Sequence, residues 1–131
     1  MREVALVFDY SGRPIHWVDG ASGVVIPDSK SLWDVIWKNK AVIGGVAHTH
    51  PWRGETQPSG TDLSTFSAID RALGRHLNWP IITLTHDQYF RYCSDESAYL
   101  ELFCPVELRY GQWENNIVEL RRRSHEGEEH G

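Results

Sequence analysis

The ten residues 41–50, AVIGGVAHTH, constrain the fold of this chain more than any other stretch. The run is apolar up to its two histidines, and Pro51 ends it because proline cannot donate a hydrogen bond to a neighbouring strand. A continuous apolar run of this length predicts a buried central strand. The rest of the chain must therefore supply neighbouring strands and helices that cover it.

Hydrophobic patterns on either side predict those neighbours. Strands are expected at residues 3–8, 14–18, 24–26, 80–85, 88–93 and 106–110. Helices are expected from Asp28 or Ser29 to Asn39, over 58–77, and in a last short segment with Trp113, Ile117 and Leu120 on one face. We therefore expect an α/β fold with a mixed central β-sheet flanked by helices.

Length and composition predict one domain. A chain of 131 residues, 40% of them hydrophobic, is long enough for one hydrophobic core and too short for two ordinary ones. We expect this domain over residues 1–122, and a polar C-terminal tail over 123–131. No stretch of about 18 apolar residues is present, and the N-terminus lacks the pattern of a secretory signal, so we expect a cytoplasmic protein without a membrane span.

Cysteine spacing and charge exclude some classes of site. Cys93 and Cys104 form no Cys-x-x-Cys pair, so reduced thiols are expected rather than a disulfide framework or a thiolate zinc site. The net charge is −5, and the one compact basic cluster is Arg121–Arg123. This balance disfavours nucleic acid as a partner, because such binders present a basic face to the phosphates.

His48 and His50 form the first candidate site. Residues i and i+2 of a strand point to the same face and lie roughly 6.6 Å apart along it, so both imidazoles can approach one ion. The alternative is two histidines with unrelated hydrogen-bond partners.

Ser59 and Asp62 open the second predicted helix, where Ser-x-x-Asp resembles a capping box. On a helical wheel, however, Asp62 falls in the inward stripe that contains Phe66, Ile69, Leu73 and Leu77. Burying an unpaired carboxylate is costly, and a metal ion would compensate for it. Asp70 lies at the edge of the same stripe, so this argument alone leaves a cap and a ligand both open.

Two imidazoles and one carboxylate leave a fourth position for water, which is the open coordination of a catalytic zinc site. A hydrolase of this kind also needs a general base. Glu3 is the one glutamate that precedes the histidines in the sequence. The alternative for Glu3 is an ordinary exposed residue near the chain terminus.

The pattern His48-Thr-His50-Pro51, then Ser59-x-x-Asp62, with a glutamate on an upstream strand, resembles the JAMM or MPN+ metalloprotease family. Eight residues separate His50 from Ser59, whereas the family pattern has seven. The likeness spans residues 2 to about 92 and extends to the RadC-type and other short prokaryotic members.

This resemblance implies a cytidine-deaminase-like α/β fold and one zinc ion per chain. The implied roles are zinc ligation by His48, His50 and Asp62, general base for Glu3, and oxyanion donor for Ser59. The implied activity is removal of ubiquitin or a ubiquitin-like protein from a conjugated partner or a C-terminal extension. Alternatives are a protease that processes a sulfur-carrier protein, and a RadC-like, nucleic-acid-associated protein without hydrolase activity.

The loop after the histidines offers candidate substrate contacts. Trp52 and Arg53 directly follow the ligand strand and are expected to line a groove for an extended tail. For Trp52, packing in the core is an equal alternative. If Glu3 is not the base, Glu55 in this loop is the next candidate.

Overall fold

The computed structural model of the chain describes residues 2–22 and 30–129. The strands are β1 (Arg2–Asp9), β2 (Pro14–Ser22), β3 (Ile43–Thr49), β4 (Trp79–Ile82), β5 (Asp87–Cys93) and β6 (Ala98–Leu102). The helices are α1 (Lys30–Lys38), α2 (Gly60–Leu73) and α3 (Trp113–Glu129), with a short 3₁₀ helix η1 (Val106–Leu108). The predicted α/β class is confirmed.

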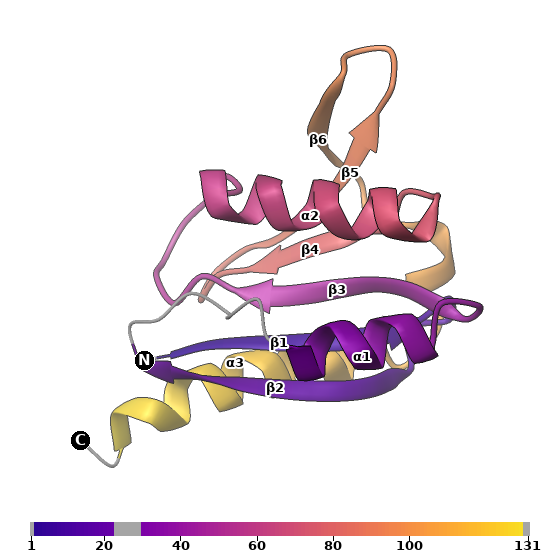
Figure 1. The fold of residues 1–131 in the computed structure, drawn as a ribbon. Helices are drawn as coiled ribbons and strands as arrows, with labels where there is room; N and C mark the ends of the chain where they lie inside the picture. The colour runs from indigo at the N-terminus through magenta and orange to yellow at the C-terminus, as the bar shows by residue number, and fades with distance from the viewer. Residues whose placement is uncertain (1, 23–29, 130–131) are drawn as a thin grey trace.

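The six strands form one mixed sheet in the order β2-β1-β3-β4-β5-β6 (Figure 1). β3 and β4 are parallel, and every other neighbouring pair is antiparallel. β3 lies inside the sheet and is buried along its whole length, so the predicted central strand is confirmed. The connection from β3 to β4 runs through α2, which therefore begins close to the end of β3.

Helices cover both faces of the sheet: α1 and α2 lie on one, and α3 lies on the other (Figure 1). We call these the α1/α2 face and the α3 face. The side chains of β1 alternate between them, since Ala5 and Val7 pack with α1 and α2, whereas Leu6 and Phe8 pack against α3. The same alternation assigns Glu3, two residues before Ala5, to the α1/α2 face.

Close approach of two backbones explains one of the glycines in β3. A Cβ atom on Gly45 would lie 2.1 Å from the carbonyl oxygen of Asn78 and 2.6 Å from the ring of Phe8. Such distances are far below van der Waals contact, so no larger residue fits without displacing backbone. The Gly-Gly pair therefore lets the segment before β4 pack directly on β3.

The strands of the structure differ from the predicted ones near the C-terminal part of the sheet. The prediction of a strand at 106–110 is wrong: these residues begin with η1, in which the N–H of Leu108 donates to the carbonyl of Pro105 at 3.0 Å and its side chain is buried on the α3 face. The sixth strand is instead β6. The short strand predicted at 24–26, and the helix caps Asp28 and Ser29, lie outside the described residues.

The last helix is longer than its apolar pattern predicts. α3 continues to Glu129, so most of the segment 123–131 is helical where a tail is expected. Ion pairs one turn apart, Arg122 and Arg123 with Glu119, stabilise this polar part, and the hydroxyl of Ser124 donates to the carbonyl of Arg2 at 2.6 Å. Over residues 2–22 and 30–129, none of the helices has the length and apolar character needed to cross a membrane.

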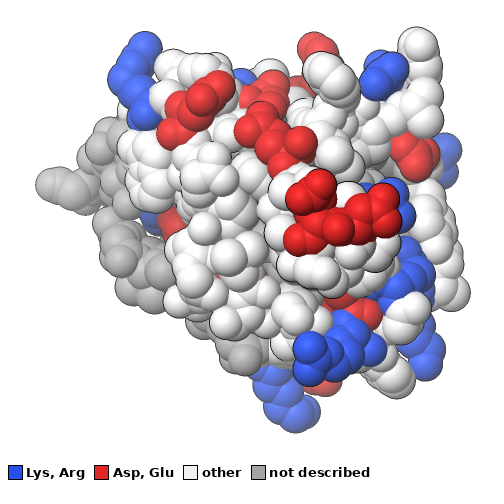
Figure 2. All heavy atoms as spheres, turned by 90° about the horizontal axis from the view of Figure 1, so that it is seen from above, with Lys and Arg blue, Asp and Glu red and all other residues white. Residues whose placement is uncertain are grey.

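Charged side chains are distributed unevenly on the surface. On the face turned to the viewer in Figure 2, acidic side chains occupy the middle, whereas Lys and Arg side chains lie toward the rim. Cys93 and Cys104 are both free, and each is partly rather than fully buried.

Candidate metal centre

β3 brings the two histidines together. His48 pairs with Ala5 of β1 and with Ile81 of β4, and the N–H of His50 donates to the carbonyl of Ile82 at 3.0 Å. Strands on both sides therefore hold the backbone here. The two residues are 6% and 3% exposed, and their Nε2 atoms lie 3.2 Å apart. The predicted convergence of the two imidazoles is confirmed.

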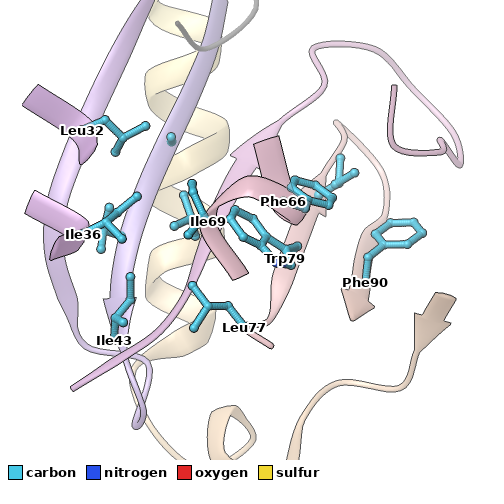
Figure 3. Close-up of a cluster of buried hydrophobic side chains, with 12 residues drawn as sticks. Leu32, Ile36, Ile43, Phe66, Ile69, Leu77, Trp79 and Phe90 are labelled. Atoms are coloured by element: carbon cyan, nitrogen blue, oxygen red, sulfur yellow. The ribbon is translucent and has the colours of Figure 1, made fainter. Parts of the chain in front are cut away.

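Asp62 enters the same space from the first turn of α2. Ser59 is the N-cap: its hydroxyl accepts from the N–H of Asp62 at 3.0 Å, and Asp62 Oδ2 accepts from the N–H of Ser59 at 2.9 Å. The capping box is therefore real. Asp62 is nevertheless buried, because the same face of α2 carries Phe66 and Ile69 into the layer that also holds Trp79 (Figure 3).

The three side chains approach one another closely. Asp62 Oδ1 lies 3.3 Å from His48 Nε2, and Asp62 Oδ2 lies 3.1 Å from His50 Nε2. All the ligand atoms of this group are within 4.8 Å of one another, and all three residues are buried. This group can hold a metal ion. The two alternatives for Asp62, cap and ligand, are not exclusive, since one carboxylate makes both sets of contacts.

The electrostatics of the site keep the carboxylate ionised. Burial raises the pKa of Asp62, but its side-chain contacts with His48 and His50, the charge of His48 and the N–H of Ser59 lower that pKa by more. The pKa of Asp62 therefore lies well below its ordinary value. An ionised carboxylate beside two imidazoles is a suitable donor set for a divalent cation.

Glu3 lies on β1, the strand beside the histidines. Ala5 is opposite His48 and belongs to the α1/α2 face. By the alternation of a regular strand, Glu3, two residues earlier, is assigned to that same face. Val4 belongs to the α3 face, and its N–H donates to Thr49 Oγ1 at 2.9 Å, which ties the start of β1 to the end of β3. Glu3 is only 9% exposed, so the alternative of an ordinary exposed residue is wrong.

Trp52 and Arg53 follow the ligands in the loop. The Trp52 ring lies 4.6 Å from the His50 ring, centroid to centroid, and the side chain is 47% exposed. Packing in the core is therefore the wrong alternative for Trp52, which covers one side of a ligand and remains open to solvent. Arg53 and Glu55 are exposed in the same loop.

Sequence reasoning missed two residues of this site. Thr56 Oγ1 lies 2.9 Å from Nδ1 of His50, the nitrogen that faces away from Asp62. Gln88 of β5 is 2% exposed and binds the backbone of Thr56 in both directions. No pattern in the sequence signals these contacts, because they depend on how the loop folds back onto β5.

The second inward aspartate of α2 has a different environment. Asp70 accepts from four donors: the N–H of Leu77, Nε1 of Trp79, Nδ1 of His76 and the hydroxyl of Tyr99. Its place in the fold is thus explained without a ligand. Burial, followed by the hydrogen bond and charge of Asp70, raises the pKa of Tyr99 above its ordinary value.

No protein-family model matches the chain, and no curated protein matches it either.

Proposed function

We propose that this chain is a zinc-dependent peptidase or isopeptidase of the JAMM type, which separates a ubiquitin-like protein from a conjugated partner or from a C-terminal extension. One observation carries the proposal: His48, His50 and Asp62 converge in a buried site whose donor set suits a divalent cation. The buried Glu3 belongs to β1, the neighbouring strand. The JAMM resemblance assigns the same four residues to the reaction.

The ligand set favours zinc. Two ligand atoms about 2.0–2.2 Å from a tetrahedral zinc ion lie roughly 3.3–3.6 Å from each other. The two Nε2 atoms lie 3.2 Å apart, and each lies 3.3 or 3.1 Å from one of the two carboxylate oxygens of Asp62, so the spacings are close to this range. Two imidazoles disfavour calcium and magnesium, which prefer oxygen ligands. Three protein ligands leave a fourth position open, as in catalytic zinc sites.

The remaining residues supply the proton chemistry. When bound, zinc would polarise the scissile carbonyl and lower the pKa of a water molecule to about 7. Glu3, on the neighbouring strand, would accept the proton of the attacking water. The hydroxyl of Ser59 already accepts from the N–H of Asp62, and its own O–H would donate to the oxygen that gains charge.

The surface around the site supports a protein substrate. Trp52 and Arg53 are exposed beside the ligands and offer an aromatic ring and a cation to an extended chain. The net charge of −5, and acidic side chains in the middle of the face shown in Figure 2, disfavour nucleic acid.

The test is cleavage of defined substrates. The purified chain is incubated with ubiquitin-like proteins that carry a C-terminal extension or an amine-linked partner, and the products are identified by mass spectrometry. We expect cleavage at the end of the ubiquitin-like domain, loss of activity on zinc chelation and recovery when zinc is added. A zinc-loaded chain that leaves every such conjugate intact would contradict the proposal, as would steeply salt-dependent nucleic-acid binding in its place.

A further inference from the structure

The contact between Thr56 and His50 determines which nitrogen of the imidazole carries the proton. The hydroxyl of Thr56 donates to the carbonyl of Gln57 at 3.3 Å. A hydroxyl has one proton, so Thr56 is the acceptor in its 2.9 Å contact with His50 Nδ1. In the metal-binding form of His50 the proton therefore sits on Nδ1, and Nε2, the nitrogen that lies nearest to His48 and Asp62, would be left for the ion.

This tautomer is the one that a metal site requires. A ligating imidazole binds the ion through an unprotonated nitrogen, and a partner on the other ring nitrogen sets the orientation of the ring. Without that partner, the proton could also occupy Nε2, where it would compete with an ion. The Thr56 hydroxyl thus selects the binding-competent form of His50.

Gln88 keeps Thr56 in place. Gln88 Oε1 accepts from the N–H of Thr56 at 2.8 Å, and Gln88 Nε2 donates to the carbonyl of Thr56 at 3.0 Å. The side-chain amide thus makes the pair of hydrogen bonds to the Thr56 backbone that a neighbouring strand would make. Its second Nε2 proton is donated to Glu101 Oε1 of β6 at 3.1 Å, so the orientation of the amide is fixed by three partners.

The same loop is also held at a point that does not touch a ligand. The N–H of Gly54 donates to Thr85 Oγ1 at 2.7 Å, and the carbonyl of Trp52 accepts from the N–H of Leu84 at 2.8 Å. Thr85 therefore anchors the loop in the way that Gln88 does, but its hydroxyl contacts no imidazole of the metal centre. This difference provides a matched control.

We infer that Thr56, held by Gln88, is a positioning residue that fixes the tautomer of His50 for metal binding. The inference rests on the proposed function, because it assumes that His48, His50 and Asp62 bind zinc. It assigns a role in the metal centre to β5, a strand that carries none of the JAMM motif residues.

The experiment measures zinc affinity, by competition with a chromophoric chelator, in four variants of the full chain. Thr56→Val removes the hydroxyl and keeps the shape, whereas Thr56→Ser keeps the hydroxyl. Gln88→Leu releases the backbone of Thr56, and Thr85→Val weakens the loop at the control point. We expect about 10–100-fold weaker binding in Thr56→Val, near wild-type binding in Thr56→Ser and Thr85→Val, and weaker binding in Gln88→Leu.

A second readout follows the Nδ1 proton of His50 by nitrogen-15 NMR of the zinc-loaded protein. This proton should exchange slowly in the wild type and in Thr56→Ser, and be lost from the spectrum in Thr56→Val. Equal loss of affinity in Thr56→Val and Thr85→Val would overturn the assignment, as would wild-type affinity in Thr56→Val. Wild-type affinity in Gln88→Leu would overturn the part assigned to Gln88.

Failure of this inference can be told apart from failure of the proposed function. Zinc binding without cleavage of any conjugate would count against the function alone, because the affinity of each variant would still be measured. A wild-type chain that binds no zinc would overturn both.

Discussion

α2 carries two buried aspartates about two turns apart, and their surroundings differ. Asp70, at 3% exposure, meets two backbone or indole N–H groups, an imidazole and a phenol, all of which donate to it. Asp62, at 6%, meets the Nε2 atoms of two histidines, which themselves are 3.2 Å apart. Asp70 has three donors that always carry a proton, the two N–H groups and the phenol, whereas Asp62 has one such donor, the N–H of Ser59, and two imidazole nitrogens that can be metal ligands.

This difference explains why a helical wheel cannot tell a structural acid from a ligand. Burial of a carboxylate requires compensation in both places. At Asp70 the protein provides it completely, so the residue should contribute to stability and not to metal binding. At Asp62 each imidazole Nε2 either carries a proton and donates to the carboxylate, or leaves a lone pair that a metal ion can take. Changes near Asp70 should therefore alter stability, whereas changes near Asp62 should alter metal binding or turnover.

The largest effect is expected at Asp70. Asp70→Ala leaves the buried N–H of Leu77 and Nε1 of Trp79 without their acceptor, and each such group costs about 1–3 kcal/mol. The free energy of unfolding, measured with urea, should therefore fall by about 2–6 kcal/mol. The exposed Asp34→Ala, which removes only a surface ion pair with Lys30, is the control. A loss no greater than in Asp34→Ala would remove the structural role of Asp70.

At the metal centre, Glu3→Gln on β1 should reduce cleavage by roughly 10²–10⁴-fold, because glutamine keeps the size of the side chain and removes the proton acceptor. Zinc content and stability should stay unchanged. Turnover is measured at saturating conjugate, with the exposed Glu55→Gln as the control. Normal turnover in Glu3→Gln together with a loss in Glu55→Gln would move the base to the loop.

Ser59 is expected to contribute both to turnover and to the stability of α2. Ser59→Ala should lower turnover by about 10²–10³-fold if its hydroxyl donates to the oxyanion. Loss of the cap should lower the free energy of unfolding by about 1 kcal/mol in addition. Kinetics and a denaturation curve on the same variant distinguish the roles: a loss of stability with normal turnover would leave Ser59 as a cap only.

The smallest effect is expected at Tyr99. Tyr99→Phe removes one of the four donors to Asp70, the 2.6 Å contact from the phenol, and leaves three in place. We expect a loss of about 1.5 kcal/mol in the free energy of unfolding, with unchanged zinc affinity. A change in zinc affinity would show that the two ends of α2 are coupled.

Strand periodicity and turn residues sufficed to predict most of the fold. The apolar runs of β1 and β3 and the turn residues between β1 and β2 appear directly in the sequence, and so does the i, i+2 spacing of His48 and His50. β6 was missed because its residues are half-buried or exposed and it forms a hairpin with β5. The segment 106–110 alternates like a strand, but Pro105 and the buried side chain of Leu108 make a turn of it.

The candidate site was predictable only in part. Asp62 could be recognised from its position in the apolar stripe and its distance from the cap, because both depend on local helix geometry. Thr56 and Gln88 could not, since their contacts span 32 residues and depend on the path of a loop without periodicity. The extent of α3 was underestimated because its last turns are held by ion pairs rather than by an apolar face.

The central claim, that Asp62 is a metal ligand and Asp70 is not, is tested most directly by the zinc content of purified variants. Zinc per chain is measured by mass spectrometry in the wild type, Asp62→Ala, His48→Ala/His50→Ala and Asp70→Asn. We predict one zinc ion per chain in the wild type and in Asp70→Asn, and none in the other two. Full zinc occupancy in His48→Ala/His50→Ala, or its loss in a folded Asp70→Asn with retention in Asp62→Ala, would contradict this account.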